Sequence, residues 1–135
     1  MRSALSYLLA AFLTAAPSAQ ASWPISPSEQ ARAFAMCAGL YSAQTEHQRQ
    51  FHGMVSADAS ARAALFSSML EAVLPDAVDY GLPATQAVTW QVQAKAGHAK
   101  LLSASVFGMI PERARPARAA ARRDLEACDR LVFGS

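Results

Sequence analysis

The chain has 135 residues, of which 53% are hydrophobic, and its 12 Lys and Arg residues against 10 Asp and Glu give a formal net charge of +2. This length suits one domain with one core and is short for two. The nearly balanced charge excludes a strong overall attraction to nucleic acid or to anionic membranes. Alanine is the most frequent residue and β-branched residues are few, so helix propensity favours an all-α fold.

The first 21 residues are typical of a secretory signal peptide. A basic start at Arg2 precedes an apolar run over Ala4–Ala16, and the segment 19–21 supplies small residues at alternate positions. We expect cleavage between Ala21 and Ser22, which leaves residues 22–135 as a single helical domain in the periplasm or outside the cell. The apolar run is short for a helix across ~30 Å of hydrocarbon, so we predict no permanent membrane anchor. A retained N-terminal anchor is the alternative.

The chain has two cysteines, Cys37 and Cys128. In an exported protein, two cysteines most often form one intramolecular disulfide. Because this bridge closes a long loop, the chain-entropy model assigns it about 4–5 kcal/mol. A redox-active or metal-binding thiol pair is the alternative, and the absence of a Cys-x-x-Cys motif argues against it.

Two helices are predicted in the first half of the chain. Ser26 and Glu29 form a capping box around Pro27, which predicts a helix from residue 27 to about residue 52. Gly39 lies within it at a cost of about 1 kcal/mol, tolerable if a neighbouring helix passes closely. Asp58 caps a second helix over 59–74, which Pro75 ends. The first helix has an apolar face of Ala33, Cys37, Leu40, Gln44, His47 and Phe51.

Two more helices are predicted in the second half. Pro83 begins a third helix that runs to about Gly108, and Pro116 begins a fourth that runs to about Val132. The predicted apolar face of the third helix is Val88, Val92, Ala99, Leu102, Val106 and Met109, with Trp90 and Leu101 away from it. The predicted inward residues of the fourth helix are Ala117, Ala121, Leu125, Cys128 and Val132. We therefore predict a four-helix bundle, or a close variant, in which Cys37–Cys128 joins the first and last helices.

Polar residues late in the first helix and in the middle of the third form a candidate ligand-binding centre. Glu46 and His47 meet Lys95 and His98 if these two helices pack together. Buried groups of this kind must be paired, because an unpaired one costs ~1–3 kcal/mol. The alternatives are a structural network that fixes helix register, or a solvated flank.

No metal or cofactor is predicted. His47 and His52 do not share a helix face, and neither Glu-x-x-His nor Cys-x-x-Cys-His occurs. No nucleophile motif is present, so we favour a protein that is not an enzyme. A cell-envelope hydrolase using Glu46 and Glu71 as paired carboxylates is the less favoured alternative.

Arg115, Arg118 and Arg122 lie on one face of the fourth helix and form a candidate partner surface for an acidic protein or polyanionic envelope material. Arg122 and Glu126 are an i, i+4 pair, which is typical of an ordinary solvated face. No aromatic residues alternate with these arginines, so nucleic acid is not an expected partner.

The chain resembles small, uncharacterised, exported bacterial helical proteins with one cysteine near each end. The residues that carry this resemblance are Cys37-Ala38-Gly39, Ser42, Glu46-His47, Lys95, His98 and Cys128. Through Cys37-x-Gly39-x-Tyr41 it is also similar to periplasmic immunity proteins of the Rap/Tai type, which are helical and neutralise secreted cell-wall toxins. We therefore expect a non-enzymatic periplasmic interaction or binding protein, with a small-ligand or metal binder as the alternative and the oligomeric state open.

Overall fold

The computed structural model describes residues 24, 26–52 and 56–134, and the predicted signal peptide and its cleavage site lie outside them. These residues form four helices: α1 (Pro27–His52), α2 (Ala57–Asp79), α3 (Ala84–Phe107) and α4 (Pro111–Phe133). No strand occurs in the described part of the chain. The predicted all-α architecture is therefore confirmed, and so is the disulfide between Cys37 of α1 and Cys128 of α4.

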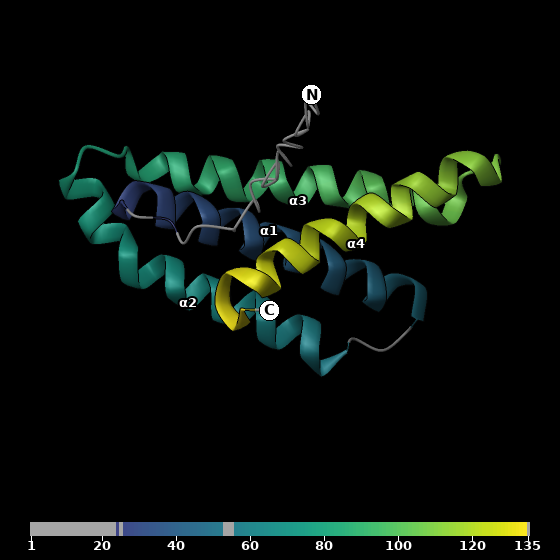
Figure 1. Ribbon diagram of the computed structural model, residues 1–135, viewed down its shortest axis with the longest axis horizontal. Coiled ribbons are helices and arrows are strands. Elements are labelled where there is room, and N and C mark those ends of the chain that lie inside the picture. The colour runs from purple at the N-terminus through teal and green to yellow at the C-terminus, as the bar shows by residue number, and fades with distance from the viewer. Residues whose placement is uncertain (1–23, 25, 53–55, 135) are drawn as a thin grey trace, which may run out of the picture.

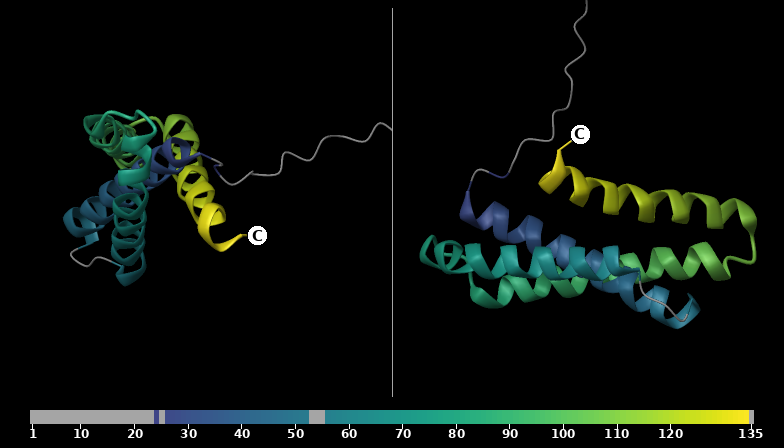
Figure 2. Two further views of the ribbon diagram at one scale, coloured as in Figure 1. Left: turned by 90° about the vertical axis from the view of Figure 1, so that its left-hand side faces the viewer. Right: turned by 90° about the horizontal axis from the view of Figure 1, so that it is seen from below.

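Helix α1 is central to the molecule. It packs against α2 and α3 along its length, while α4 packs mainly on α3 and crosses in front of α1 (Figures 1 and 2). The core at these contacts consists largely of alanines, with the aromatic rings of Phe34, Tyr41 and Phe66 as its bulkiest apolar members. The Tyr41 and Phe66 rings stack with their centroids 5.8 Å apart. Alanine brings the helix axes close together but buries little area per residue.

The start of α1 and the close approach to α3 match the sequence prediction. The Glu29 amide donates to Ser26 Oγ at 3.2 Å, and the Ser26 amide donates to Glu29 Oε2 at 3.0 Å, which completes the capping box. At Gly39, an added Cβ would lie 2.2 Å from the Gln91 carbonyl oxygen of α3. A neighbouring helix therefore does pass closely at this glycine.

Three predicted boundaries are wrong. Helix α2 begins at Ala57 with Ser56 as its cap, rather than at residue 59 with Asp58, because Ser56 Oγ accepts a hydrogen bond from the Ala59 amide. The other two are wrong because proline is tolerated inside a helix when the surrounding structure compensates for it. Helix α2 continues through Pro75 to Asp79 and ends in a Schellman motif, in which the Leu82 amide donates to the Ala77 carbonyl. Gly81, with a φ of 97°, provides the left-handed residue that this motif requires. Helix α4 begins at Pro111 rather than at Pro116, since Pro111 already has the φ of a first helical residue.

The predicted inner face of α3 is wrong except at Leu102, which is buried as predicted. Val88 and Val92 are 60% and 59% exposed, and Val106 and Met109 are exposed as well. The buried residues of this helix are Ala87, His98, Leu102 and Ser105. Trp90, predicted to lie away from the core, packs against it. The close backbone contact at Gly39 selects the small-residue face of α3 rather than its most hydrophobic face.

Candidate functional site

An apolar pocket of about 640 Å³ lies between α1, α3 and α4. Each helix contributes one stripe of residues at i, i+3, i+4 and i+7, the spacing of a single helix face. The lining residues are Ala33, Met36, Cys37 and Leu40 of α1, Ala94, Gly97, His98 and Leu101 of α3, and Asp124, Ala127, Cys128 and Leu131 of α4. This volume is within the range of small-molecule sites in proteins.

Small residues are the reason that the pocket exists. Ala33, Ala94, Gly97 and Ala127 line it at positions where larger side chains would fill the space. An added Cβ at Gly97 would meet nothing within 4 Å. Because the Cys37–Cys128 bridge joins two of the three walls, with Cα atoms 5.7 Å apart, α4 is held beside α1 without closing over the space.

His98 is the buried polar group of this pocket. Its side chain is fully buried, and its Nε2 lies 3.4 Å from Gln44 Oε1. Its Nδ1 is also buried and has no hydrogen-bond partner, because the nearest carboxylate oxygen, Asp124 Oδ2, is 3.9 Å away. A buried polar atom without a partner costs about 1–3 kcal/mol, so native structures seldom retain one without a reason.

The environment of His98 favours the neutral imidazole. Burial lowers the pKa of His98 below its ordinary value, the neighbouring His47 lowers it further, and Asp124 opposes this shift in part. In the neutral ring one nitrogen carries the proton. We assign this proton to Nε2, which faces the Gln44 side-chain oxygen, and this assignment leaves Nδ1 as an acceptor beside Asp124.

The four residues of the predicted polar centre lie along the α1–α3 contact but do not share one pocket. Lys95 Nζ pairs with Glu46 Oε1 at 2.5 Å, with both side chains partly exposed. The His47 ring packs on Phe51, with centroids 4.6 Å apart. Glu46 and His47 line a separate hollow of about 150 Å³, so only His98 of the four faces the apolar pocket.

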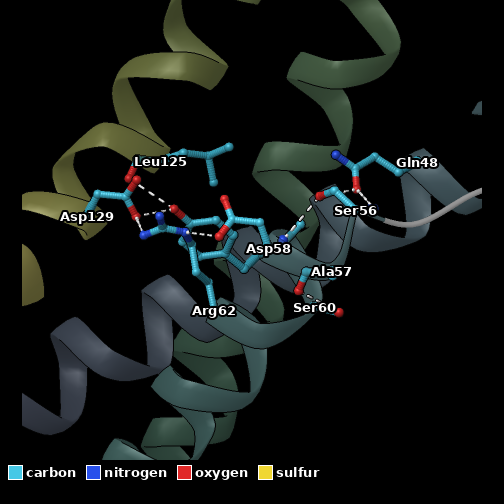
Figure 3. A network of polar contacts seen from close by, with 10 residues as sticks. Gln48, Ser56, Ala57, Asp58, Ser60, Arg62, Leu125 and Asp129 are labelled. Atoms are coloured by element: carbon cyan, nitrogen blue, oxygen red, sulfur yellow. Dashed lines mark hydrogen bonds and ion pairs between the residues drawn. The ribbon is translucent and has the colours of Figure 1, made fainter.

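A polar network between α4, α2 and α1 fixes the third wall (Figure 3). Arg62 of α2 places Nη1 2.5 Å from Asp129 Oδ1 of α4 and Nε 3.4 Å from Asp58 Oδ1. Tyr41 of α1 donates its hydroxyl to the same Asp129 oxygen. Burial and the hydrogen bond to Asp129 raise the pKa of Tyr41 above its ordinary range. The network therefore ties α1, α2 and α4 together.

The predicted partner surface on α4 is exposed. Arg115, Arg118 and Arg122 all face solvent. Arg118 Nη2 donates to the Ser105 carbonyl of α3 at 3.2 Å, and Arg122 pairs with Glu126 of its own helix at 3.5 Å. The two carboxylates of the hydrolase alternative are not brought together, since Glu46 and Glu71 line different hollows.

Sequence reasoning identified His98 and the two cysteines but missed the small residues and Asp124. Ala94, Gly97 and His98 share the face of α3 that carries the buried Ala87. Asp124 precedes Cys128 by one helical turn and therefore lies on the disulfide face of α4. These residues could have been found from their spacing, because Ala94 lies four residues before His98 and Asp124 lies four residues before Cys128.

Neither a protein-family model, nor a curated protein, nor a solved structure matches this chain. The two resemblances described above therefore stay predictions. Within residues 24, 26–52 and 56–134, no group of three or more His, Cys, Asp or Glu residues is arranged to hold a metal ion. None of the four described helices is long and apolar enough to cross a membrane.

Proposed function

We propose that this chain is an exported, non-enzymatic binding protein that holds a small, largely apolar molecule in the pocket between α1, α3 and α4. The observation that carries the proposal is the bare, buried Nδ1 of His98 in a pocket otherwise lined mostly by apolar side chains. A few polar atoms in an apolar cavity are the usual composition of a small-molecule site.

The polar atoms define the chemical class of the ligand. Nδ1 of His98 accepts a hydrogen bond, and the carboxylate of Asp124 at 3.9 Å is also an acceptor. A hydroxyl or amine of the ligand therefore fits this corner, whereas a carboxylate is repelled by Asp124. The remaining walls are aliphatic and suit a hydrocarbon body. The proposed ligand is thus an amphiphile whose head group donates hydrogen bonds.

The disulfide supports the exported location. Such bridges persist in oxidising compartments and are rare in the cytosol, and this one lines the pocket itself. Together with the predicted signal peptide over residues 1–21, it favours the periplasm or the cell exterior.

The test is displacement of an environment-sensitive apolar dye by twelve-carbon compounds that differ only in the head group. We expect 1-dodecanol and dodecylamine to compete better than dodecanoate. In His98→Leu the ratio of the affinities for 1-dodecanol or dodecylamine to that for dodecanoate should fall about three- to tenfold, which corresponds to the loss of one hydrogen bond. The dye itself should still bind.

The matched controls are two leucine substitutions on adjacent residues of α3. Gly97→Leu places a side chain in the empty space of the pocket and should abolish dye binding. Ala96→Leu adds the same side chain at an exposed position that does not line the pocket. Gly97→Leu raises helix propensity and Ala96→Leu lowers it only slightly, so unfolding does not explain a loss. Equal dye binding by Gly97→Leu and the unmodified protein would refute the proposal.

A further inference from the structure

A cluster of apolar side chains is exposed where α3 turns into α4. This turn lies at one end of the molecule (Figures 1 and 2). Met109 is 97% exposed and Phe107 60% exposed, and Val106 and Ile110 are exposed beside them. Phe51 at the end of α1 joins the cluster through its ring, whose centroid is 5.3 Å from that of Phe107. We call these five residues the α3–α4 tip.

The backbone of the turn holds the tip outward. At Gly108 an added Cβ would lie 2.6 Å from the Ala104 carbonyl oxygen and 3.3 Å from the Ala114 Cβ. The turn therefore brings α4 close to α3, and Met109 projects into solvent beside it. Exposed apolar side chains that gather in one place, rather than singly, mark interaction sites.

Basic side chains surround the tip. Arg113 and Arg115 lie on the first turns of α4, both exposed, and neither has an ion-pair partner among the described residues. Arg118 and Lys100 lie further along α4 and α3, also exposed. Glu112 is the single acidic residue in the segment 97–123. The end of the molecule is thus cationic although the whole chain is almost neutral.

We infer that the α3–α4 tip docks on an anionic lipid surface, with Met109 and Ile110 in the boundary between head groups and acyl chains. Apolar side chains with basic residues around them are the arrangement by which proteins bind such surfaces without spanning them. A second copy of the chain fits less well, since the arginines around two facing tips would repel. An acidic protein complements the charge but not the Met109 side chain, which projects almost entirely into solvent.

The experiment is co-sedimentation of the disulfide-bonded protein with vesicles of phosphatidylcholine alone or mixed with phosphatidylglycerol. We expect binding to the anionic vesicles and little to the zwitterionic ones. Each basic residue near an anionic surface contributes about fivefold in affinity, so Arg113→Gln with Arg115→Gln should weaken binding at least about tenfold. Met109→Glu with Ile110→Glu should abolish it.

Two controls separate this surface from others and from the pocket. Val88→Glu with Val92→Glu changes exposed apolar residues of the same helix about 25 Å from the tip, and should leave vesicle binding unchanged. Gly97→Leu fills the pocket and should also leave it unchanged. Met109→Trp should add a tryptophan emission that shifts to shorter wavelength on anionic vesicles.

Three results would overturn the inference. The first is equal binding to zwitterionic and anionic vesicles, or to neither. The second is a loss of vesicle binding in Val88→Glu with Val92→Glu that equals the loss in Met109→Glu with Ile110→Glu. The third is a dimer in size-exclusion chromatography that Met109→Glu converts to a monomer, which would assign the tip to self-association instead.

Discussion

Gly39 of α1 lies directly against the backbone of α3, where an added Cβ would be 2.2 Å from the Gln91 carbonyl oxygen and 3.0 Å from the Lys95 amide nitrogen. Real Cβ atoms do not approach backbone atoms this closely, so a larger residue would push the helices apart. The contact determines which face of α3 meets α1. It therefore also determines that His98 is buried.

We predict that Gly39→Ala destabilises the protein although alanine favours a helix. The methyl group forces a backbone shift, which costs about 1–3 kcal/mol and exceeds the gain of about 1 kcal/mol in helix propensity. Gly97→Ala is the matched control on α3, because its Cβ enters open space, and it should stabilise by up to about 1 kcal/mol. Denaturant unfolding of both variants measures the difference. A Gly39→Ala protein as stable as Gly97→Ala would contradict the close contact.

Much of the fold could be predicted from short stretches of sequence, because the relevant interactions involve residues close together in the chain or on one helix face. Ser26 and Glu29 specify where α1 begins, because their reciprocal hydrogen bonds involve residues three positions apart. Cys37 and Cys128 each lie on an apolar helix face, which was enough to predict their bridge. Gly39 indicated a close helix approach, and the structure confirms it.

What the sequence did not reveal depends on contacts between helices. The valines of α3 gave the stronger hydrophobic pattern, yet Val88 and Val92 are exposed because the approach at Gly39 requires small residues on the facing side. The pocket was not predicted for the same reason. It arises where alanines and Gly97 of three helices leave space, and no single segment of sequence shows a volume.

We predict that reduction of the disulfide detaches α4 before it unfolds α1, α2 and α3. Helix α4 packs mainly on α3, and its contact with α1 is small, so the bridge and the Asp129 network together hold α4 against α1. Replacing both cysteines by serine should lower the free energy of unfolding by about 4–5 kcal/mol in the chain-entropy model. Dye binding to the pocket should disappear on reduction at denaturant concentrations where far-ultraviolet circular dichroism still reports helix. Retention of full dye binding by the reduced protein would contradict this role.

We predict that Tyr41→Phe destabilises the protein by about 1.5–3 kcal/mol, the range for a hydrogen bond to a charged group. The change removes the hydroxyl that donates to Asp129 and leaves the ring stack on Phe66 intact. Asp58→Ala is the control on the same network: this carboxylate is 77% exposed, and exposed pairs contribute about 0–1 kcal/mol. Unfolding in urea compares the two. An equal decrease in the free energy of unfolding in Tyr41→Phe and Asp58→Ala would show that the network is not centred on Asp129.

Finally, we predict that stability decreases as the pH falls below about 6.5, the ordinary pKa of histidine. Burial lowers the pKa of His98, with a further contribution from His47 and partial opposition from Asp124. The unfolded chain therefore binds a proton on this residue at a pH where the folded chain does not. The contribution of neutral His98 to the free energy of unfolding is fully present above the pKa that this residue has in the unfolded chain. It is lost as the pH falls from that value to the lower pKa in the folded chain, by at most about 1.4 kcal/mol per pH unit.

The measurement for this prediction is the free energy of unfolding at a series of pH values from about 8 to 5. His98→Gln cannot titrate and retains an amide toward Gln44, so its stability should depend less on pH than that of the unmodified protein. In His47→Gln the loss of stability at low pH should become smaller but remain, because His47 contributes only part of the lowering of the His98 pKa. A His98→Gln protein with the same pH dependence as the original would mean that the buried ring is not the titrating group. That result would also weaken the assignment of Nδ1 as a neutral acceptor facing the ligand.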